Sequence, residues 1–307
     1  MTVQSRDPSA DPLYARPLPE RPSYATGMML AAQDFSDEQT YHRGRLARAL
    51  AQLSGNGTLA GLRVHYEPEV IGGDAPHPEE IVVDPGVAVD RLGRLIEVPR
   101  PACLRLVPWF TQQAAVQGGD AMRLASYDNL ARFASVRRQA DATPLPAAAV
   151  VADVYLRFIA CAHGYTPSFA TGPYDALDAV SVSRLRDAYE VVMTLRAGLS
   201  NTNSGLPLQG ADLSGQSPAD RRAATQDAVL AAYPATGRSG STDPLDPLPE
   251  HPLVFDHSAV FLARLFMPVQ ALVATGAPLR SAEAPQVDNF GRRFLPAVNL
   301  LANAIGL

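Results

Sequence analysis

The feature that most constrains the fold is a two-residue alternation that runs from Val150 to Cys161. Successive side chains of a β-strand point to opposite faces, so an alternation of this length predicts a long strand with one face on a core. The apolar face would consist of Val150, Ala152, Val154, Leu156 and Phe158. The other face would carry Asp153, Tyr155 and Arg157. An alternating segment at 182–195 and an apolar segment at 253–267 predict further strands.

A second β region precedes this strand. Short apolar runs predict strands at 62–66, 81–84, 87–89 and 95–98. The sequence Asp90-Arg91-Leu92-Gly93 connects the last two strands as a hairpin, and Asp84-Pro85-Gly86 forms a tight turn ahead of it. Because glycine adopts the left-handed backbone at little cost, we expect both Gly86 and Gly93 at positive φ.

A helix is predicted from Asp34, a favoured N-cap residue, to the Gly55-Asn56-Gly57 sequence that ends it. One mostly apolar face of this helix consists of Phe35, Gln39, His42, Leu46, Ala49, Leu50 and Leu53. Gln39 and His42 are its polar members, and buried polar groups need hydrogen-bond partners. We therefore expect both to bond backbone of the β region or of the C-terminal part. Glu38 and Tyr41 would complete this structural hydrogen-bonding group.

Composition and predicted elements divide the chain into four parts. They are an extended proline-rich arm at 1–26, a helix and β-hairpin region at 27–110, a helical insertion and linker at 111–149, and a β-rich region at 150–307. The insertion holds a predicted helix at 119–139. The last part contains a long polar loop at 198–252, in which Ser217 and Pro218 begin a short helix, and a C-terminal helix or irregular segment at 296–305. The predicted fold class is α+β, mostly antiparallel sheet with the N-terminal helix packed on it.

Charge and hydropathy exclude several classes of protein. The 307 residues carry a net charge of −5 and no basic block, so nucleic-acid binding has no electrostatic support. No apolar run reaches the roughly 20 residues that cross a bilayer, and residues 1–24 lack the pattern of a secretory signal. We therefore expect assembly in the cytoplasm without membrane insertion. Cys103 and Cys161 have no CxxC neighbour and are expected to be buried free thiols rather than a disulfide.

Candidate active sites are few. Glu38 and His42 share a helix face at i, i+4, a spacing that suits a metal, but no further ligands accompany them. His251, Asp256 and His257 cluster beside a predicted strand, where histidines are usually solvated or capping. We therefore assign no catalytic residue, no metal ligand and no cofactor, and predict that the chain is not an enzyme.

Four blocks of residues occur in a familiar order. The first comprises Gly27-Met28-Met29-Leu30, Asp34-Phe35, Glu38-Gln39-x-Tyr41-His42-Arg43 and Gly61-Leu62-x-Val64. The others are Val82-x-Asp84-Pro85-Gly86-x-Ala88-x-Asp90-x-x-Gly93-Arg94-x-Ile96, Arg184-Leu185-Arg186-Asp187-Ala188-Tyr189-Glu190 and Val287-Asp288-Asn289-x-x-Arg292-Arg293. Together they resemble a structural protein family encoded beside phage-tail-like extracellular contractile injection systems. The chain departs from the family pattern at 50–56, where the family has a basic, histidine-containing stretch, and at 111–146 and 198–252.

The resemblance implies a baseplate-, plug- or cap-associated structural role without known catalysis. The partners it implies are tube, sheath, baseplate or cap components and further copies of the chain. Such a particle assembles in the cytoplasm and can leave the cell as an extracellular or virion-like body. Arg43, Arg45 and Arg48 form an outer helix side that is either solvated or a subunit contact, and Arg292 and Arg293 are further candidate contacts.

Other functions stay open beside this one. They are a phage tail protein outside an injection system, a binding module that recognises a carbohydrate or protein partner through the 198–252 loop, and a metal-dependent hydrolase using His42 or His257. In the assembly hypothesis the arm, the loop and the Arg43–Arg48 face carry the subunit contacts. Removal of residues 1–22 should then leave the core folded but prevent incorporation into particles.

Overall fold

The computed structural model describes residues 11–14, 20–73, 75–115, 124–167, 180–196, 204–208, 213, 215–231, 245–252, 255–270 and 277–304. Their strands form three sheets in which every named strand pair is antiparallel. The predicted α+β fold class with a mostly antiparallel sheet is therefore confirmed. Much of the 1–26 arm and of the 198–252 loop lies outside the described residues.

The central sheet is built on one long strand, as the alternation at 150–161 predicts. Its strands are β7 (Ser126–Tyr127), β8 (Ala149–Pro167), β9 (Val180–Leu195), β10 (Val260–Pro268) and β11 (Gln286–Asp288). β8 pairs with β10 along one edge, and with β7 and then β9 along the other. β11, which the sequence did not lead us to predict, pairs with β10.

Two three-stranded sheets come from the predicted β region. One consists of β1 (Gly57–Gly61), β4 (Gly86–Val89) and β5 (Leu95–Val98). The other consists of β2 (Val64–Glu67), β3 (Glu80–Val83) and β6 (Ala102–Arg105). The expected strand at 62–66 is corrected to β2 at Val64–Glu67, and β1 is a separate strand that was not predicted. Gly61 and Leu62 adopt positive φ and interrupt the extended backbone between β1 and β2.

The two turn glycines behave differently. Gly93 has φ +84 in the β4–β5 hairpin, as predicted. The prediction of positive φ at Gly86 is wrong, because Gly86 is the first residue of strand β4. Its need for glycine has another cause: a Cβ there would lie 2.3 Å from the carbonyl oxygen of Ala60 on the neighbouring strand.

The main core lies between the predicted apolar face of β8 and the two smaller sheets. Val150, Val154 and Leu156 pack there with residues of β3, β5 and β10. The opposite face of β8 was expected to be polar and yet is also buried, with Asp153 and Tyr155 fully inaccessible. Ionic and hydrogen-bonding partners make this burial possible, as described below.

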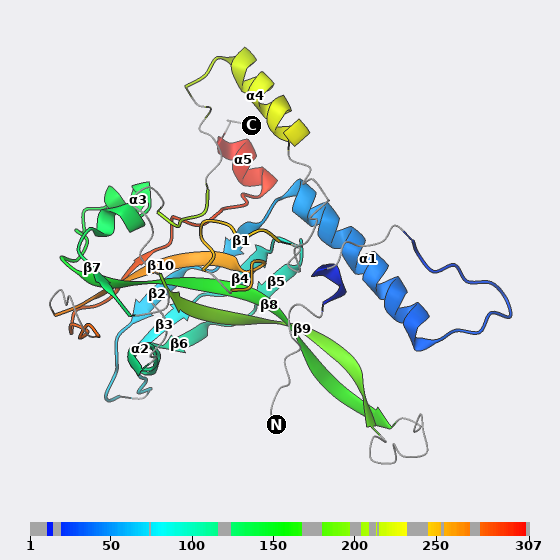
Figure 1. Cartoon of the computed structure of the whole chain (residues 1–307), viewed down its shortest axis with the longest axis horizontal. Helices are drawn as coiled ribbons and strands as arrows, with labels where there is room; N and C mark the ends of the chain where they lie inside the picture. Colours follow the sequence, from blue (N-terminus) through cyan, green and yellow to red (C-terminus); the bar gives the residue numbers. More distant parts are fainter. Residues whose placement is uncertain are drawn as a thin grey trace.

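The helices lie around these sheets (Figure 1). They are the 3-10 helices η2 (Pro12–Tyr14) and η4 (Leu130–Phe133), and the α-helices α1 (Ala32–Leu53), α2 (Leu106–Ala115), α3 (Val136–Gln139), α4 (Pro218–Ala231) and α5 (Val298–Ala304). The predicted helix at 119–139 is wrong over its described part, which holds β7, η4 and α3 instead. α2 was not predicted. Among the helices of the described ranges, none has the length and hydropathy needed to cross a bilayer.

Helix α1 touches the sheets with a face that the sequence did not indicate. It begins two residues before Asp34, whose carboxylate accepts a hydrogen bond from the N–H of Ala31 at 2.7 Å. Gly44 and Ala47 are its buried residues, whereas Leu46 and Leu53 of the predicted apolar face are 64% and 86% exposed. The small residues let the helix backbone approach the β4–β5 turn closely, so the larger apolar side chains face outward.

The two cysteines are free thiols, as expected, but their burial was predicted wrongly. Cys103 is exposed and Cys161 is half-buried. Cys103 lies on β6, at an edge of its three-stranded sheet, and its side chain points away from the core.

Candidate assembly surfaces and the polar networks behind them

A two-stranded ribbon projects from the central sheet. β8 and β9 stay paired from Ala152 and Leu195 out to Pro167 and Val180, whereas β10 accompanies β8 only as far as Leu156. Residues 159–167 of β8 and 180–188 of β9, here called the ribbon, therefore pair only with each other among the named strands. Figure 1 shows the ribbon extending well away from the rest of the molecule.

The ribbon exposes both of its faces. Residues 163–167 and 182–187 are all exposed. Apolar groups alternate there with cationic ones: Tyr165 is 62% exposed, and Arg186 lies 3.0 Å from the Nε2 atom of His163. A two-stranded ribbon is at best marginally stable alone in water. Its length, exposure and mixed chemistry suit contact with another surface.

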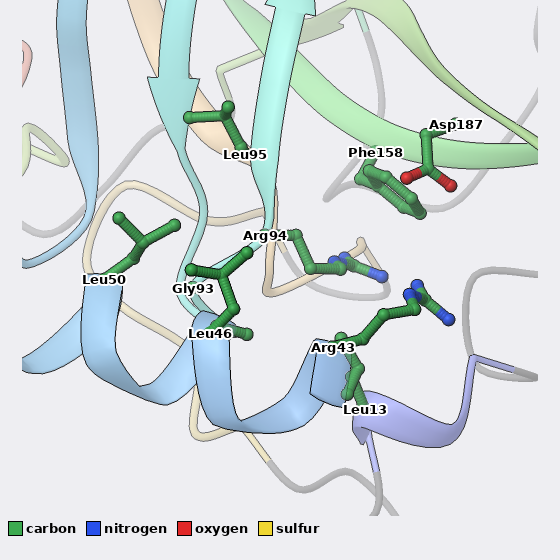
Figure 2. A pocket seen from close by; sticks show the side chains of 10 residues that line it. Leu13, Arg43, Leu46, Leu50, Gly93, Arg94, Leu95, Phe158 and Asp187 are labelled. Atoms are coloured by element: carbon green, nitrogen blue, oxygen red, sulfur yellow. The ribbon is translucent and has the colours of Figure 1, made fainter. Parts of the chain in front are cut away.

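A small hollow lies at the base of the ribbon, between α1 and the β4–β5 turn. Figure 2 shows Arg43 and Arg94 reaching from these two elements toward Phe158 and Asp187. The hollow measures about 130 Å³. Sites for small organic ligands usually measure roughly 300–1,000 Å³, so this one is too small for a substrate of that size.

The predicted turn residue Asp90 anchors that region. Its buried carboxylate accepts hydrogen bonds from the N–H of Leu92 at 2.9 Å, the N–H of Arg94 at 2.8 Å and the Nε atom of Arg94 at 2.7 Å. Burial raises the pKa of Asp90, and the opposing charge of Arg94 only partly offsets this effect. Arg94 also stacks 4.6 Å from the Phe158 ring centroid. The hairpin is thereby fixed to β8.

A second ionic network explains the buried polar face of β8. The Asp153 carboxylate lies between Arg264, whose Nε donates at 2.7 Å, and Arg196, whose Nε donates at 2.6 Å. Burial alone would raise the pKa of Asp153, but the charges of Arg196 and Arg264 outweigh it and lower the pKa. Arg264 also donates to the carbonyl oxygens of Phe133 and Ser204, each at 2.7 Å. The network therefore fastens loops to the sheet.

The candidate contact residues divide into exposed and buried ones. Arg45 and Arg48 are exposed on α1, and Arg43 is half-buried beside Asp11 at 3.3 Å. Arg292 is corrected from a subunit contact to a core residue, because it is 2% exposed and donates to the carbonyl oxygen of Leu62 at 2.6 Å. Burial lowers its pKa to about 10.

Arg293, the neighbouring candidate, is half-buried. Its Nη1 atom donates to Glu250 Oε1 at 2.5 Å. The two arginines of the C-terminal block thus tie that block to Leu62 and to the segment around Glu250. A buried position could not be inferred from the sequence, since arginines are usually exposed.

The predicted hydrogen-bonding group on α1 is wrong. Gln39 and His42 are exposed, and neither has a backbone partner from the β region or the C-terminal part among the described contacts. His42 Nε2 lies 4.0 Å from Glu38, and Glu38 accepts a hydrogen bond from the hydroxyl of Tyr24 at 3.0 Å. An α-helix turns about 100° per residue, so His42 and the buried Gly44 lie on nearly opposite sides of α1.

The histidine cluster near 251–257 fixes loops, in line with the capping interpretation. His251 is buried: its Nδ1 accepts from the N–H of Leu248 at 3.3 Å, and its Nε2 donates to the Ala259 carbonyl at 3.1 Å. Burial lowers the pKa of His251 to about 4. Asp256 accepts a hydrogen bond from the Tyr14 hydroxyl at 2.5 Å. The groups of this cluster therefore form contacts within the chain.

The short N-terminal helix η2 belongs to the same network. Leu13 is buried, and the Asp11 carboxylate lies 3.1 Å from Arg94 Nη1. The expectation that little of the core lies within residues 1–22 is therefore corrected. A hydrophobic side chain and an ion pair of that segment are packed against the fold.

No family model matches the chain, and no curated protein matches it.

Proposed function

We propose that this chain is a non-catalytic structural subunit of a contractile injection system or another phage-tail-like particle. Its partners would be further copies of itself and tube, sheath, baseplate or cap components. Assembly would take place in the cytoplasm, with release as part of the finished particle. The observation that carries this proposal is the ribbon, which extends beyond the sheet and whose two strands pair with no further named strand.

The ribbon is a weakly stabilised element in an isolated subunit. Exposed apolar side chains such as Tyr165 and Leu185 contribute little to the stability of an isolated subunit. Burial against a neighbouring subunit would remove their surface from water and satisfy the open strand edges. A ribbon of this kind is useful in an assembly, because it reaches a neighbour while the core keeps its shape.

The rest of the molecule has the rigidity that such a role requires. Buried ion pairs around Asp153 and Asp90 hold loops and hairpins at fixed positions. Networks of this type specify a single arrangement when every group is satisfied. The hollow that Arg94 lines measures about 130 Å³, below the roughly 300–1,000 Å³ of sites for small organic ligands.

A second candidate is a binding module that recognises a carbohydrate or protein through the 198–252 loop. Helix α4 favours it, because this helix has no buried residue and exposes Val229 and Leu230 at its end. Such a helix needs a partner surface if it is to stay folded. The partner can be a particle subunit, so α4 is compatible with both candidates.

The deciding experiment is purification of particles from cells that express the tagged chain together with its neighbouring particle genes. We expect the chain at a fixed stoichiometry in the purified particles by quantitative mass spectrometry. Absence of the chain from intact particles would overturn the structural proposal. Binding to a glycan or to a single non-particle protein under the same conditions would favour the second candidate.

A further inference from the structure

A group of three metal-ligating side chains lies where β2 ends and β3 begins. It consists of Glu67, His77 and Glu80, all half-buried, and one ligand atom from each lies within 4.8 Å of the others. The sequence alone did not indicate this group, because its members are spread over the connection between the two strands. It lies outside the surfaces proposed above for assembly.

The strand register brings two like charges together here. Glu67 and Glu80 are directly opposite each other on β2 and β3, so their side chains project from the same face of the sheet. Like charges in this position destabilise a sheet unless a cation lies near them. Arg105 offsets the negative charge of Glu80 only weakly, since its Nε atom is 4.0 Å from the carboxylate and its side chain is 70% exposed. His65 Nε2 lies 3.3 Å from Glu67 Oε1 on the same strand.

His77 is held in the orientation that a metal ligand needs. Its backbone exchanges two hydrogen bonds with Val70, of 2.9 and 3.2 Å, which fix the residue within the β2–β3 connection. Its Nδ1 atom lies 3.0 Å from the Pro78 carbonyl oxygen. Nδ1 must carry the proton in that bond, so the lone pair of the neutral ring is on Nε2. Metal-bound histidines usually show this arrangement, with the second ring nitrogen donating to a carbonyl or carboxylate.

We propose that Glu67, His77 and Glu80 bind one divalent transition-metal ion of the Zn²⁺ class. One imidazole nitrogen and two carboxylates are borderline and hard ligands that suit Zn²⁺, whereas Ca²⁺ and Mg²⁺ prefer sites made only of oxygen. The fourth position would hold water. Cys103 is the adjacent thiol, since it lies opposite Val82 on the neighbouring strand β6. The ion would cancel the repulsion between the two glutamates and close the β2–β3 connection.

The test is a calorimetric titration of the full chain with ZnCl₂ after treatment with a chelator. We expect one Zn²⁺ per chain, and a higher thermal unfolding midpoint with Zn²⁺ than without. His77→Ala should weaken Zn²⁺ binding at least about 10-fold. Loss of a residue that only hydrogen-bonds to a metal ligand already lowers metal affinity by about that factor. Glu80→Gln should weaken it similarly, and it serves as the second variant if His77→Ala does not fold.

The matched control is His42→Ala, which removes an exposed histidine that also lies beside a glutamate. This variant should bind Zn²⁺ as the wild type does. The proposal is overturned if the wild type binds no stoichiometric Zn²⁺, if Mg²⁺ or Ca²⁺ binds more tightly than Zn²⁺, or if His77→Ala and Glu80→Gln both bind like the wild type. Loss of binding in His42→Ala alone would place the ion elsewhere and would equally refute it.

Discussion

Single residues show how closely the helix and the hairpin approach each other. Gly93 combines φ +84 with a contact that leaves no room for a side chain: its Cβ would lie 1.8 Å from the Ala47 carbonyl oxygen. Gly27 has nearly the same φ, +85, but a Cβ there would meet no atom of a non-neighbouring residue within 4 Å. A comparison of the two glycines therefore separates the free-energy cost of the left-handed backbone from the free-energy cost of the steric contact.

Replacing each glycine by alanine should reveal this difference. Gly27→Ala should lower the free energy of unfolding by about 1 kcal/mol, the cost of a left-handed alanine. Gly93→Ala should lower it by at least about 2 kcal/mol more, because α1 must move away from the hairpin. Urea unfolding of both variants measures the two values. Equal losses would mean that α1 does not lie against Gly93.

His251 gives stability a defined pH dependence. Burial lowers its pKa to about 4, below the roughly 6.5 of an unfolded histidine. Between these two values the unfolded state binds more protons, so the free energy of unfolding falls as the pH falls from 6.5 toward 4. The loss should reach about 2 kcal/mol at pH 5.

The measurement is urea unfolding at pH 7 and pH 5 for the wild type and His251→Gln. The variant should lose less stability than the wild type between these two pH values, whatever its stability at pH 7. His42→Gln is the control, because it removes an exposed histidine that takes no part in the contacts of His251. A wild-type slope retained in His251→Gln would show that other groups cause it.

At this scale the sequence predicts some roles and not others. Asp90 and Gly93 were assigned to a turn because Asp-x-x-Gly is a local pattern, and local geometry decides their positions. Gly86 was assigned the wrong φ, because its requirement comes from Ala60, a residue on another strand. The burial of Arg264 and Arg292 has no local signature, since it depends on partners distant in the sequence, Asp153 for Arg264 and Leu62 for Arg292.

Among the elements, the ribbon extends beyond the part of β8 that pairs with β10, and this extra length does not contribute to the core. Ala162 and Leu185 are directly opposite each other, so a short turn can join the strands there without a change of register. Replacing residues 163–184 by Asn-Gly would remove the exposed end and keep the part of β8 and β9 that covers the core.

We expect this shortened chain to keep its unfolding free energy within about 0.5 kcal/mol, because the described side chains that it loses, at 163–167 and 182–184, are all exposed. It should fail to enter particles in the purification described above. Val136→Ser is the control, since it removes an apolar side chain that is 85% exposed on α3 and away from the ribbon. Normal incorporation of the shortened chain would exclude the ribbon as the contact.

The elements also show where periodicity is informative. The alternation in β8 predicts the face that packs on the smaller sheets, because period-two burial is a property of a single strand. It does not predict the burial of the other face, which depends on the segments around Gly205 and Glu250 that Arg196 bonds. The apolar stripe of α1 was misleading, because the helix meets the sheets through its small residues.

At the scale of the whole molecule, the chain closes on itself through its N-terminal segment. The hydroxyl of Tyr14 reaches Asp256, Asp11 reaches Arg94, and Leu13 is buried between them. These contacts join residues more than eighty positions apart, so they stabilise the tertiary arrangement rather than any single element. The segment that was predicted to be an extended assembly arm therefore also has a role within the fold.

Two deletions separate these roles. Removal of residues 1–22 should lower the free energy of unfolding by about 3 kcal/mol, from the lost burial of Leu13 and the lost partners of Arg94 and Asp256. Removal of residues 1–10 keeps Asp11, Leu13 and Tyr14 and should leave stability unchanged.

Urea unfolding measures this difference in stability, and particle purification measures incorporation for the same two variants. If the longer deletion is as stable as the wild type, helix η2 contributes nothing to the fold. If the shorter deletion is stable yet missing from particles, the first ten residues are an assembly contact, as the sequence led us to expect.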